Sequence, residues 1–478
     1  MFFRQIVDPK LAQYAYLIGC QRTGEAILID PERDIDRYLA LAAQEDLKIV
    51  AVADTHIHAD YLSGLREFAE LGVKVYASAE GGEEWQYEWL KGSSYNFQFL
   101  KDGDTFKIGN IEFEAVYSPG HTPEHLSYLV TDRGGGADEP MGIVSGDFVF
   151  VGDVGRPDLL ESAAGMAGMM IPSAKTLYKS IERFLELPDY LRLWPGHGAG
   201  SACGKSLGAV PESTVGYEKR FNASINMAQR SENDFVEYIL DGQPEPPTYF
   251  ARMKRDNRQG PRVLGELPTP IQLNAEALNA LAGRKDIAVV DTRLDRSAFM
   301  AAHVAGSLYA PLDKSFNTIV GSYVDDETPV YLIIEEGDVE EAVRDLVRIG
   351  IDDIKGFSTL DTLSVLERSG SLVSIDEVTF AAVLDSQDDD GVTTVDVRRL
   401  AEYESIHVPG AVNVAHTRLS ARLNEIPGGQ KLLVHCRSGA RAAAAAAYLA
   451  REGHDVAYVN DNFDNWTLAQ SKTVEGVA

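Results

Sequence analysis

Four histidines and two aspartates in the first half of the chain could bind a metal ion. Each follows a short apolar segment and stands next to turn residues. Imidazole and carboxylate groups are common ligands of zinc, iron, manganese and nickel. One such residue is more often structural, but six are hard to explain as packing, because buried polar groups need partners. The sequence therefore predicts a metal site drawn from His56, His58, Asp60, His121, Asp147 and His197.

A cysteine near the end of the chain has the surroundings of a nucleophile. Cys436 follows the apolar segment 431–435 and precedes an alanine-rich segment that begins at Arg441. Between a strand and a helix N-terminus, a thiol faces unpaired backbone N–H groups. The helix dipole and two arginines, Arg437 and Arg441, favour the thiolate and lower its pKa. The segment therefore predicts a reactive cysteine in a loop that holds an anion or a persulfide.

Four expected strands position the metal candidates. The apolar segments 47–52, 111–117, 142–144 and 191–194 each end just before a histidine or aspartate of this set. In α/β folds, sites gather at the carboxyl ends of strands. We therefore expect the candidates to meet at one edge of a sheet.

The second half of the chain contains an internal repeat. Segment 290–293 is followed by His303, and segment 395–398 is followed by His407, so that Asp291 and Asp396 stand 105 positions apart. In each copy an apolar strand, a loop, a helix and a glycine come next. This repetition predicts two small α/β domains with parallel sheets.

A proline-rich and then basic stretch separates the two halves. We read residues 241–267 as a linker laid over a surface. The expected domains are then 1–240, 268–370 and 371–478. The whole chain is predicted to belong to the α/β class.

Composition excludes several classes of protein. Of the 478 residues, 73 are acidic and 44 are basic, giving a net charge of −29 that repels nucleic acid. The three cysteines, Cys20, Cys203 and Cys436, are too few and too distant for a disulfide framework, which favours a reducing cytosol. No run of 18 apolar residues and no signal peptide is present. We therefore expect a cytoplasmic protein that binds neither nucleic acid nor membrane.

The histidine motifs resemble those of the metallo-β-lactamase fold. Thr-His-x-His-x-Asp ends at Asp60, and Gly-His-Thr, a strand-end Asp and Gly-His-Gly follow. The resemblance implies an αββα sandwich of two mixed sheets with metal at one edge. Dinuclear hydrolases of this superfamily have a further histidine where this chain has Tyr61. A phenol loses its proton near pH 10 and is a poor ligand, so a mononuclear site is favoured.

Within this superfamily the chain resembles the persulfide dioxygenases, which use one Fe(II). Carried onto this sequence, the resemblance implies that His56, His121 and Asp147 hold one Fe(II) per chain, with zinc as the alternative metal or the metal found after purification. Two histidines and one carboxylate leave positions open for O₂ and a thiolate. The remaining candidates then orient ligands or substrate: His58, Asp60, Tyr61, Arg156, His197 and Cys203.

Two of these positions have open interpretations. Arg156 stands in a Gly-Arg-x-Asp segment that resembles one near the iron, and it orders the site, meets the carboxylates of the substrate, or forms a surface ion pair with Asp158. Cys203 stands in a glycine-rich loop after His197, where it accepts sulfur, lies near substrate or serves as a small apolar residue.

The last segment, 371–478, resembles the rhodanese family. Its landmarks are Val-Asp-Val-Arg, His-Val-Pro-Gly-Ala, the six-residue loop from Cys436 to Arg441, and Trp466. The resemblance implies a sulfurtransferase. The earlier copy has Glu335 at the place of the cysteine, so we expect 268–370 to be an inactive rhodanese-like domain.

The full order of segments resembles bacterial fusions of a persulfide dioxygenase with an inactive and an active rhodanese. The resemblance implies that a low-molecular-weight thiol persulfide and O₂ give sulfite, and that Cys436 joins sulfur to sulfite to give thiosulfate in sulfide detoxification. We expect a homo-oligomer. The alternatives are a zinc-dependent thioester hydrolase of the glyoxalase II kind with an attached sulfurtransferase, and a non-catalytic sulfur carrier or sensor.

Overall fold

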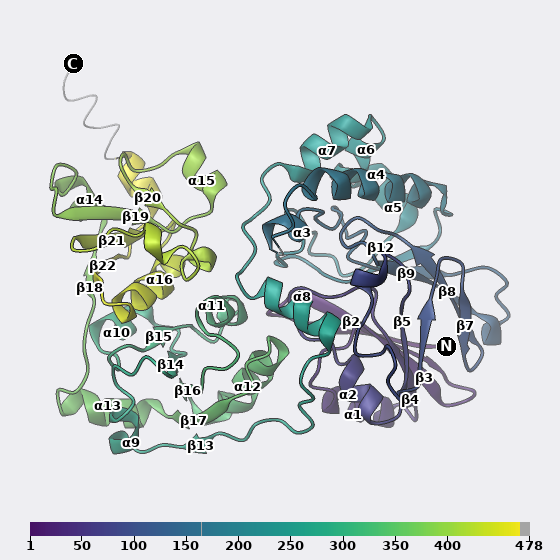
Figure 1. Cartoon of the computed structure of the whole chain (residues 1–478), viewed down its shortest axis with the longest axis horizontal. Helices are drawn as coiled ribbons and strands as arrows, with labels where there is room; N and C mark the ends of the chain where they lie inside the picture. Colours follow the sequence, from purple (N-terminus) through teal and green to yellow (C-terminus); the bar gives the residue numbers. More distant parts are fainter. Residues whose placement is uncertain (164, 469–478) are drawn as a thin grey trace. The chain divides into compact units, whose positions relative to one another are not determined.

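The computed structural model describes residues 1–163 and 165–468 (Figure 1). Its contacts divide the chain into two compact units. The first contains Met1–Glu266 together with Val347–Gly350, and the second contains the other described residues. Both units mix helices with sheets, which confirms the predicted α/β class. Among the described residues, no helix is both long enough and apolar enough to cross a membrane.

Two six-stranded sheets form the centre of the first unit. The first sheet has parallel and antiparallel pairs and runs in the order β1 (Phe2–Asp8), β2 (Gln13–Cys20), β3 (Glu25–Ile29), β4 (Lys48–Ala53), β5 (Lys74–Ser78), β6 (Phe97–Leu100). The second, also mixed, runs in the order β12 (Ser213–Thr214), β11 (Arg192–Pro195), β10 (Gly142–Gly146), β9 (Leu126–Asp132), β8 (Ile111–Tyr117), β7 (Thr105–Ile108).

Apolar side chains from both sheets pack against each other between them. Tyr16 and Ile27 of the first sheet share one buried cluster with Phe113, Tyr128 and Val144 of the second. Because side chains alternate along a strand, the opposite face of each sheet needs a cover of helices. The helices of this unit are α1 (Asp36–Gln44), α2 (Leu65–Glu70), α3 (Leu159–Ser162), α4 (Met170–Glu186), α5 (Val215–Phe221), α6 (Ala223–Ala228), α7 (Glu232–Leu240) and α8 (Phe250–Gln259), with 3₁₀ turns η1 (Glu83–Trp85) and η2 (Arg133–Gly135).

These helices complete a four-layer sandwich. Helices α1 and α2 cover the first sheet, and α4, α6 and α7 cover the second, so that they lie on opposite sides of the strands in Figure 1. The predicted αββα metallo-β-lactamase fold is confirmed by this arrangement.

The segment expected to be a surface linker, 241–267, differs from that expectation. It contains helix α8, whose buried residues Phe250, Met253, Lys254 and Asn257 recur at helical spacing along one face. The side-chain amide of Asn257 donates to the backbone carbonyl oxygens of His58 (2.9 Å) and Tyr61 (2.7 Å). The basic residues between the buried positions hid this amphipathic pattern in the sequence.

The second unit contains two five-stranded parallel sheets with the same strand order. The first runs β13 (Ile271–Gln272), β17 (Ile354–Ser358), β16 (Val330–Ile333), β14 (Ala288–Asp291), β15 (Leu308–Tyr309); the second runs β18 (Asp376–Val378), β22 (Asp455–Val459), β21 (Lys431–His435), β19 (Val392–Asp396), β20 (Val412–Asn413). The connecting helices are α9 (Ala275–Asn279), α10 (Arg296–Ala301), α11 (Phe316–Tyr323), α12 (Val339–Arg348), α13 (Leu360–Arg368), α14 (Phe380–Asp385), α15 (Leu400–Ser405) and α16 (Ala440–Arg451), with 3₁₀ turns η3 (Glu336–Asp338), η4 (His416–Arg418) and η5 (Leu423–Glu425). Residues 469–478 of the predicted last domain lie outside the described residues.

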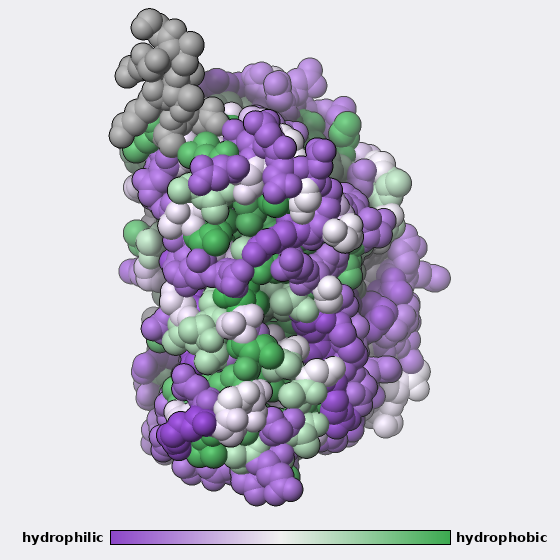
Figure 2. Space-filling model, turned by 90° about the vertical axis from the view of Figure 1, so that its left-hand side faces the viewer, coloured by the Kyte–Doolittle hydropathy of each residue, from purple (hydrophilic) through white to green (hydrophobic). Residues whose placement is uncertain are grey.

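The internal repeat is visible in side-chain contacts as well as in topology. Arg293 donates to both carboxylate oxygens of Asp291, with Nη2 at 2.7 Å from Oδ2. Arg398 makes the equivalent pair with Asp396, with Nη2 at 2.6 Å from Oδ2. The face drawn in Figure 2 shows apolar residues in small groups between hydrophilic ones, which is ordinary for a globular surface.

Candidate metal centre and cysteine loop

Three side chains from separate strand ends converge in the first unit. His56 follows β4, His121 follows β8 and Asp147 follows β10. The Oδ2 atom of Asp147 lies 3.6 Å from Nε2 of His121 and 3.9 Å from Nε2 of His56. Metal bonds of about 2.1 Å separate neighbouring ligand atoms by roughly 3 to 3.5 Å. Ligand atoms of all three residues lie within 4.8 Å of one another, so they are close enough to bind one ion after a small adjustment.

The protonation of these groups suits a cation. Burial lowers the pKa of His56 well below its usual value and that of His121 to about 4, so both imidazoles are neutral at pH 7. Burial acts to raise the pKa of Asp147, but His197 and His121 hold it low, so its carboxylate is ionised. Asp147 Oδ2 is buried and has no hydrogen-bond partner among the described residues. Two neutral imidazoles and one carboxylate fit a divalent transition metal.

His197 holds the other oxygen of Asp147 in place. Its Nδ1 lies 2.7 Å from Asp147 Oδ1, and its Nε2 lies 2.8 Å from Asp60 Oδ2. Burial acts to lower the pKa of His197, but the two carboxylates raise it well above its usual value. Because both ring nitrogens face carboxylates, His197 orients Asp147 and connects it to Asp60.

His58 and Tyr61 belong to a separate polar cluster around Asp30. His58 Nε2 lies 3.2 Å from Asp30 Oδ1 and 3.0 Å from the Tyr61 hydroxyl. Tyr61 also donates to the backbone carbonyl of Asp30 (3.3 Å). Tyr61 is thus engaged with His58 and Asp30.

Asp30 was missed in the sequence, although it follows β3 as the candidates follow their strands. Its Oδ2 accepts from the Thr55 hydroxyl (2.9 Å), which in turn lies 2.9 Å from Nδ1 of His56. This chain of contacts fixes the ring of His56 and leaves its Nε2 facing Asp147.

His125 was also missed. Its Nε2 accepts the backbone N–H of Asp147 (3.1 Å), and its ring stacks on His56 with centroids 5.1 Å apart. The sequence signal was its position four residues after His121, but its partners come from other strands.

Arg156 forms the ion pair that one interpretation expected, but in a buried place. Its guanidinium donates to both oxygens of Asp158 (2.7 and 2.6 Å) and to the carbonyl oxygen of Ala202 (3.2 Å). Its backbone carbonyl lies 3.0 Å from Nδ1 of His121. Arg156 therefore orders the loop that orients His121.

Cys203 lies beside the metal candidates. It is 1% exposed, and its Sγ groups with ligand atoms of Asp60 and His197 within 4.8 Å of one another. Burial raises the pKa of its thiol well above the usual value, and Asp60 and Asp147 raise it further. The thiol is protonated in these surroundings.

In the second unit, Cys436 stands between β21 and α16, as the sequence predicted. The thiol is 1% exposed, and Gly439 starts the helix in a left-handed conformation (φ 88°) that other residues rarely adopt. Arg441 donates to both oxygens of Glu402 (2.6 and 2.8 Å). The side chain of Arg437 is 67% exposed and lies 3.9 Å from Asp464, so it extends to the surface.

The equivalent loop of the first repeat has a different chemistry. Glu335 follows β16 at the position of Cys436, and the 3₁₀ turn η3 with two further acidic residues comes next. A pocket of about 490 Å³ remains beside it, lined by Arg293, Asp295 and Asp338 among others. Among the described residues of this loop there is no thiol.

Comparison with protein families gives two matches. Residues 8–197 match the metallo-beta-lactamase superfamily, and residues 379–469 match the rhodanese-like domain. A solved structure, a metallo-beta-lactamase from Staphylococcus aureus subsp. aureus COL, is 39% identical, with a TM-score of 0.66. It covers 75% of this chain, and this chain covers 98% of it.

Curated relatives match the first half of the chain. A Beta-lactamase hydrolase-like protein of Agrobacterium fabrum is 31% identical over 254 residues, which are 48% of this chain. The chain spans about half of that relative's length (53%). Persulfide dioxygenase ETHE1, mitochondrial, of Bos taurus is 28% identical over 233 residues, covering 48% of this chain and 77% of the relative. The chain therefore belongs to the metallo-beta-lactamase superfamily and carries a rhodanese-like domain in its last segment.

Proposed function

We propose that the first unit is a persulfide dioxygenase with one Fe(II), held by His56, His121 and Asp147. The observation that carries the proposal is the unpartnered, buried Oδ2 of Asp147, which faces the Nε2 atoms of two neutral histidines. The similarity to ETHE1 persulfide dioxygenases supports the same reaction class. The overall reaction is R–S–SH + O₂ + H₂O → R–SH + SO₃²⁻ + 2H⁺, in which the terminal sulfur loses four electrons to O₂.

When bound, Fe(II) supplies the redox chemistry with O₂. The chain's own residues supply positioning. His197 fixes Oδ1 of Asp147, and the backbone carbonyl of Arg156 fixes the ring of His121. The Thr55 hydroxyl fixes the ring of His56. Their role is to keep the three facing atoms in place while substrate enters.

Tyr61 supports a single metal ion. A second ion would need a ligand at this position, but the Tyr61 hydroxyl is occupied by His58 and Asp30. Burial also raises the pKa of this phenol well above 10, so it stays protonated and is a poor ligand. This favours the mononuclear dioxygenase over a dinuclear zinc thioester hydrolase.

For the second unit we propose sulfur transfer through Cys436. A persulfide on Cys436 passes its outer sulfur to sulfite, which releases the cysteine thiolate and thiosulfate: Cys–S–S⁻ + SO₃²⁻ → Cys–S⁻ + S₂O₃²⁻. The six-residue loop before α16 and the match to the rhodanese-like domain support this role. Glu335 in the earlier copy supports an inactive domain there.

The test combines metal analysis with O₂ uptake on protein purified without oxygen and given glutathione persulfide. We expect about one iron per chain and sulfite formation, both lost in His121→Ala and Asp147→Ala. Cys436→Ser should keep O₂ uptake and lose thiosulfate formation. Two zinc ions per chain with hydrolysis of acyl-glutathione, and no O₂ uptake, would assign the first unit to the hydrolases. Persulfidation of Cys436 with no turnover at either site would indicate a sulfur carrier.

A further inference from the structure

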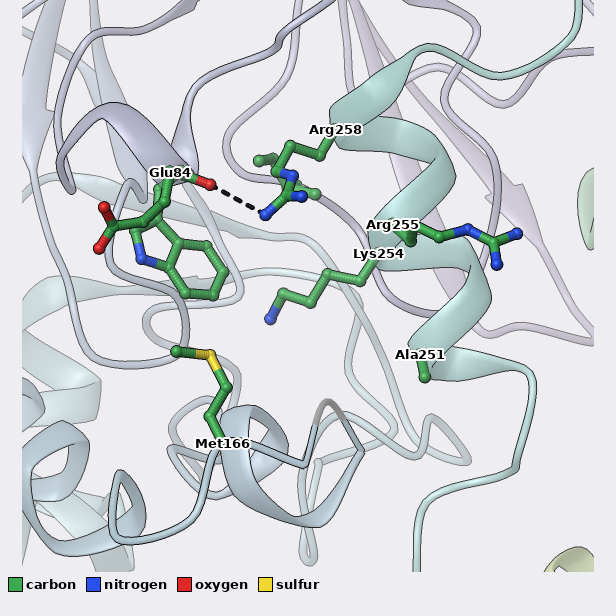
Figure 3. Close-up of a pocket in the computed structure, with 8 residues that line it drawn as sticks. Glu84, Met166, Ala251, Lys254, Arg255 and Arg258 are labelled. Atoms are coloured by element: carbon green, nitrogen blue, oxygen red, sulfur yellow. Dashed lines mark hydrogen bonds between the residues drawn. The ribbon is translucent and has the colours of Figure 1, made fainter. Parts of the chain in front are cut away.

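A pocket of the first unit is lined in part by Ile57, the residue that follows the proposed ligand His56. Its volume is about 320 Å³, and one wall comes from helix α8 (Figure 3). Another wall includes Ile57, which stands between His56 and His58 in the chain. Its remaining walls include Trp85 of η1 and Met166.

Lys254 of α8 is the unusual member of this pocket. It is 6% exposed, and its ammonium has no hydrogen-bond partner among the described residues. Its Nζ lies 5.5 Å from the centre of the Trp85 ring, a weak cation–π contact. Figure 3 shows the side chain of Lys254 extending into the pocket. A buried charge without an ionic partner is costly, so this geometry calls for an anion.

The other cations of α8 near this pocket have partners. Arg258 donates to the carbonyl oxygen of Glu84 (3.2 Å), as Figure 3 shows, and lies 3.4 Å from Glu88. Arg255 also lines the pocket, but it pairs with Asp256 (2.7 Å), its side chain is 54% exposed, and its guanidinium points away from Lys254 in Figure 3. The charge of Lys254 is therefore the one left facing into the pocket among these three.

Helix α8 lies against the segment that carries His56 and His58, because the side-chain amide of Asn257 donates to the backbone carbonyl oxygen of His58 (2.9 Å). Burial lowers the pKa of Lys254, while Glu124 and Cys203 act to raise it. Oε1 of Glu124 accepts the backbone N–H of Ile57 (2.8 Å), whereas its Oε2 is buried without a hydrogen-bond partner, and neither oxygen forms an ion pair with Lys254 among the described residues.

We propose that Lys254 binds an anionic group of the thiol that carries the persulfide, and so selects carboxylate- or phosphate-bearing thiols over neutral ones. The idea rests on the proposed dioxygenase function of the adjoining centre. An anion in this pocket would replace the missing partner of Lys254, and the sulfur end of the same molecule would extend past Ile57 toward His56 and Asp147.

The first experiment compares persulfides that differ in charge. O₂ uptake is measured with glutathione persulfide (carboxylates), coenzyme A persulfide (phosphates) and 2-mercaptoethanol persulfide (neutral) on the full chain. Lys254→Gln should raise KM at least tenfold for an anionic substrate with little change in kcat, and leave the neutral one unchanged. Lys254→Arg should recover part of the loss. The anionic substrate with the larger loss identifies carboxylate or phosphate as the bound group.

Lys107→Gln is the matched control, because it makes the same substitution at an exposed lysine of the first unit that pairs with Glu112 (3.3 Å) and does not line this pocket. It should leave all three KM values unchanged. Equal changes for charged and neutral substrates in Lys254→Gln, or no change for either, would overturn the proposal. Iron content of each variant checks that the centre is intact.

A binding experiment separates this proposal from the function on which it rests. Glutathione is titrated without oxygen, and binding is followed by the fluorescence of Trp85, identified with Trp85→Phe. We expect quenching in the wild type and its loss in Lys254→Gln. If glutathione binding depends on Lys254 but no persulfide supports O₂ uptake, the dioxygenase proposal is wrong and the anion site remains supported. If persulfides support O₂ uptake but glutathione binding does not depend on Lys254, only the anion-site proposal is wrong.

Discussion

Arg296 donates a hydrogen bond from Nη2 to the backbone carbonyl oxygen of Ser438 (3.0 Å), inside the loop that begins at Cys436. Its Nε donates to the side chain of Asn460 (3.0 Å), which follows β22 of the same sheet. Arg296 comes from α10 of the first repeat, whereas the loop belongs to the second. The repeat that carries Glu335 instead of a cysteine thus supports the cysteine loop of its neighbour.

This contact predicts that Arg296→Ala slows sulfur transfer without abolishing it. Losing a hydrogen bond from a charged group costs about 1.5 to 3 kcal/mol, which corresponds to a roughly tenfold or larger loss if the loop must be held for reaction. Sulfur transfer from thiosulfate to cyanide by the full chain measures it. The rate of Cys436 alkylation gives a second readout, which should change in Arg296→Ala and recover in Arg296→Lys.

The control for this prediction is Arg284→Ala, which removes an exposed arginine of the same repeat that pairs with Asp286. It should leave both the transfer rate and the alkylation rate unchanged. An Arg296→Ala variant that matches the wild type in both measurements would show that the loop does not depend on the first repeat.

A second prediction separates ligands from supporting residues at the metal centre. Asp147→Ala and His121→Ala should remove the metal, because each deletes one of the three facing atoms. His197→Ala should weaken binding by about 10- to 100-fold, since it removes the contacts that orient Asp147 and connect it to Asp60 but none of the three facing atoms. The amount of metal that each of the three variants retains against a competing chelator tests this order of effects. Complete loss in His197→Ala, equal to that in Asp147→Ala, would instead make His197 a ligand.

A further prediction concerns Gly155, where there is no room for a side chain next to the proposed metal centre. A Cβ atom at this position would lie 1.8 Å from the carbonyl oxygen of Asp147 and 3.1 Å from Cβ of His121. Gly155→Ala must therefore displace the backbone at Asp147, at a cost of about 1–3 kcal/mol. We expect a lower melting temperature and less bound metal. Gly428→Ala has open space around it and should change neither; a metal content unchanged in Gly155→Ala would contradict the expectation.

The sequence predicted those features of the site that depend on local patterns, but not those that depend on contacts between residues far apart in the chain. Strand ends located His56, His121 and Asp147, because the carboxyl end of a strand is readable from local apolar runs. The sequence did not predict that His56 and His58 face different partners. The two residues stand two positions apart after β4, yet one faces Asp147 and the other faces Asp30 of a neighbouring strand.

Lys254 was hidden for a related reason. The sequence around it is basic and follows prolines, which is typical of a linker. What makes it a helix with a buried face is packing against distant residues, such as the contacts of Asn257 with His58 and Tyr61. The internal repeat of the second unit, in contrast, could be predicted from the sequence. Its Asp291–Arg293 and Asp396–Arg398 pairs each join residues two positions apart.

The last prediction concerns acid stability of the first repeat. His303 is 3% exposed, and its Nδ1 lies 2.9 Å from the carbonyl oxygen of Phe299. Burial lowers the pKa of His303 from 6.5 to about 4, although the hydrogen bond to the carbonyl oxygen of Phe299 acts to raise it. Below pH 6.5 the unfolded chain therefore binds a proton that the folded chain does not take up until about pH 4. Stability is fully present above pH 6.5 and falls as the pH drops through this window, by at most about 2 kcal/mol between pH 7 and 5.

Hydrogen exchange of peptides covering 296–309, corrected for intrinsic rates, measures this loss locally. Protection in the wild type should fall from pH 7 to pH 5, and His303→Gln should flatten the dependence. His407 is the matched control, because it occupies the same position in the second repeat and its Nδ1 makes the same contact with the carbonyl oxygen of Tyr403 (2.8 Å), but it is exposed. His407→Gln should leave the dependence as it is. A wild-type protection that does not change between the two pH values would mean that His303 gains its proton in the folded state as readily as in the unfolded chain.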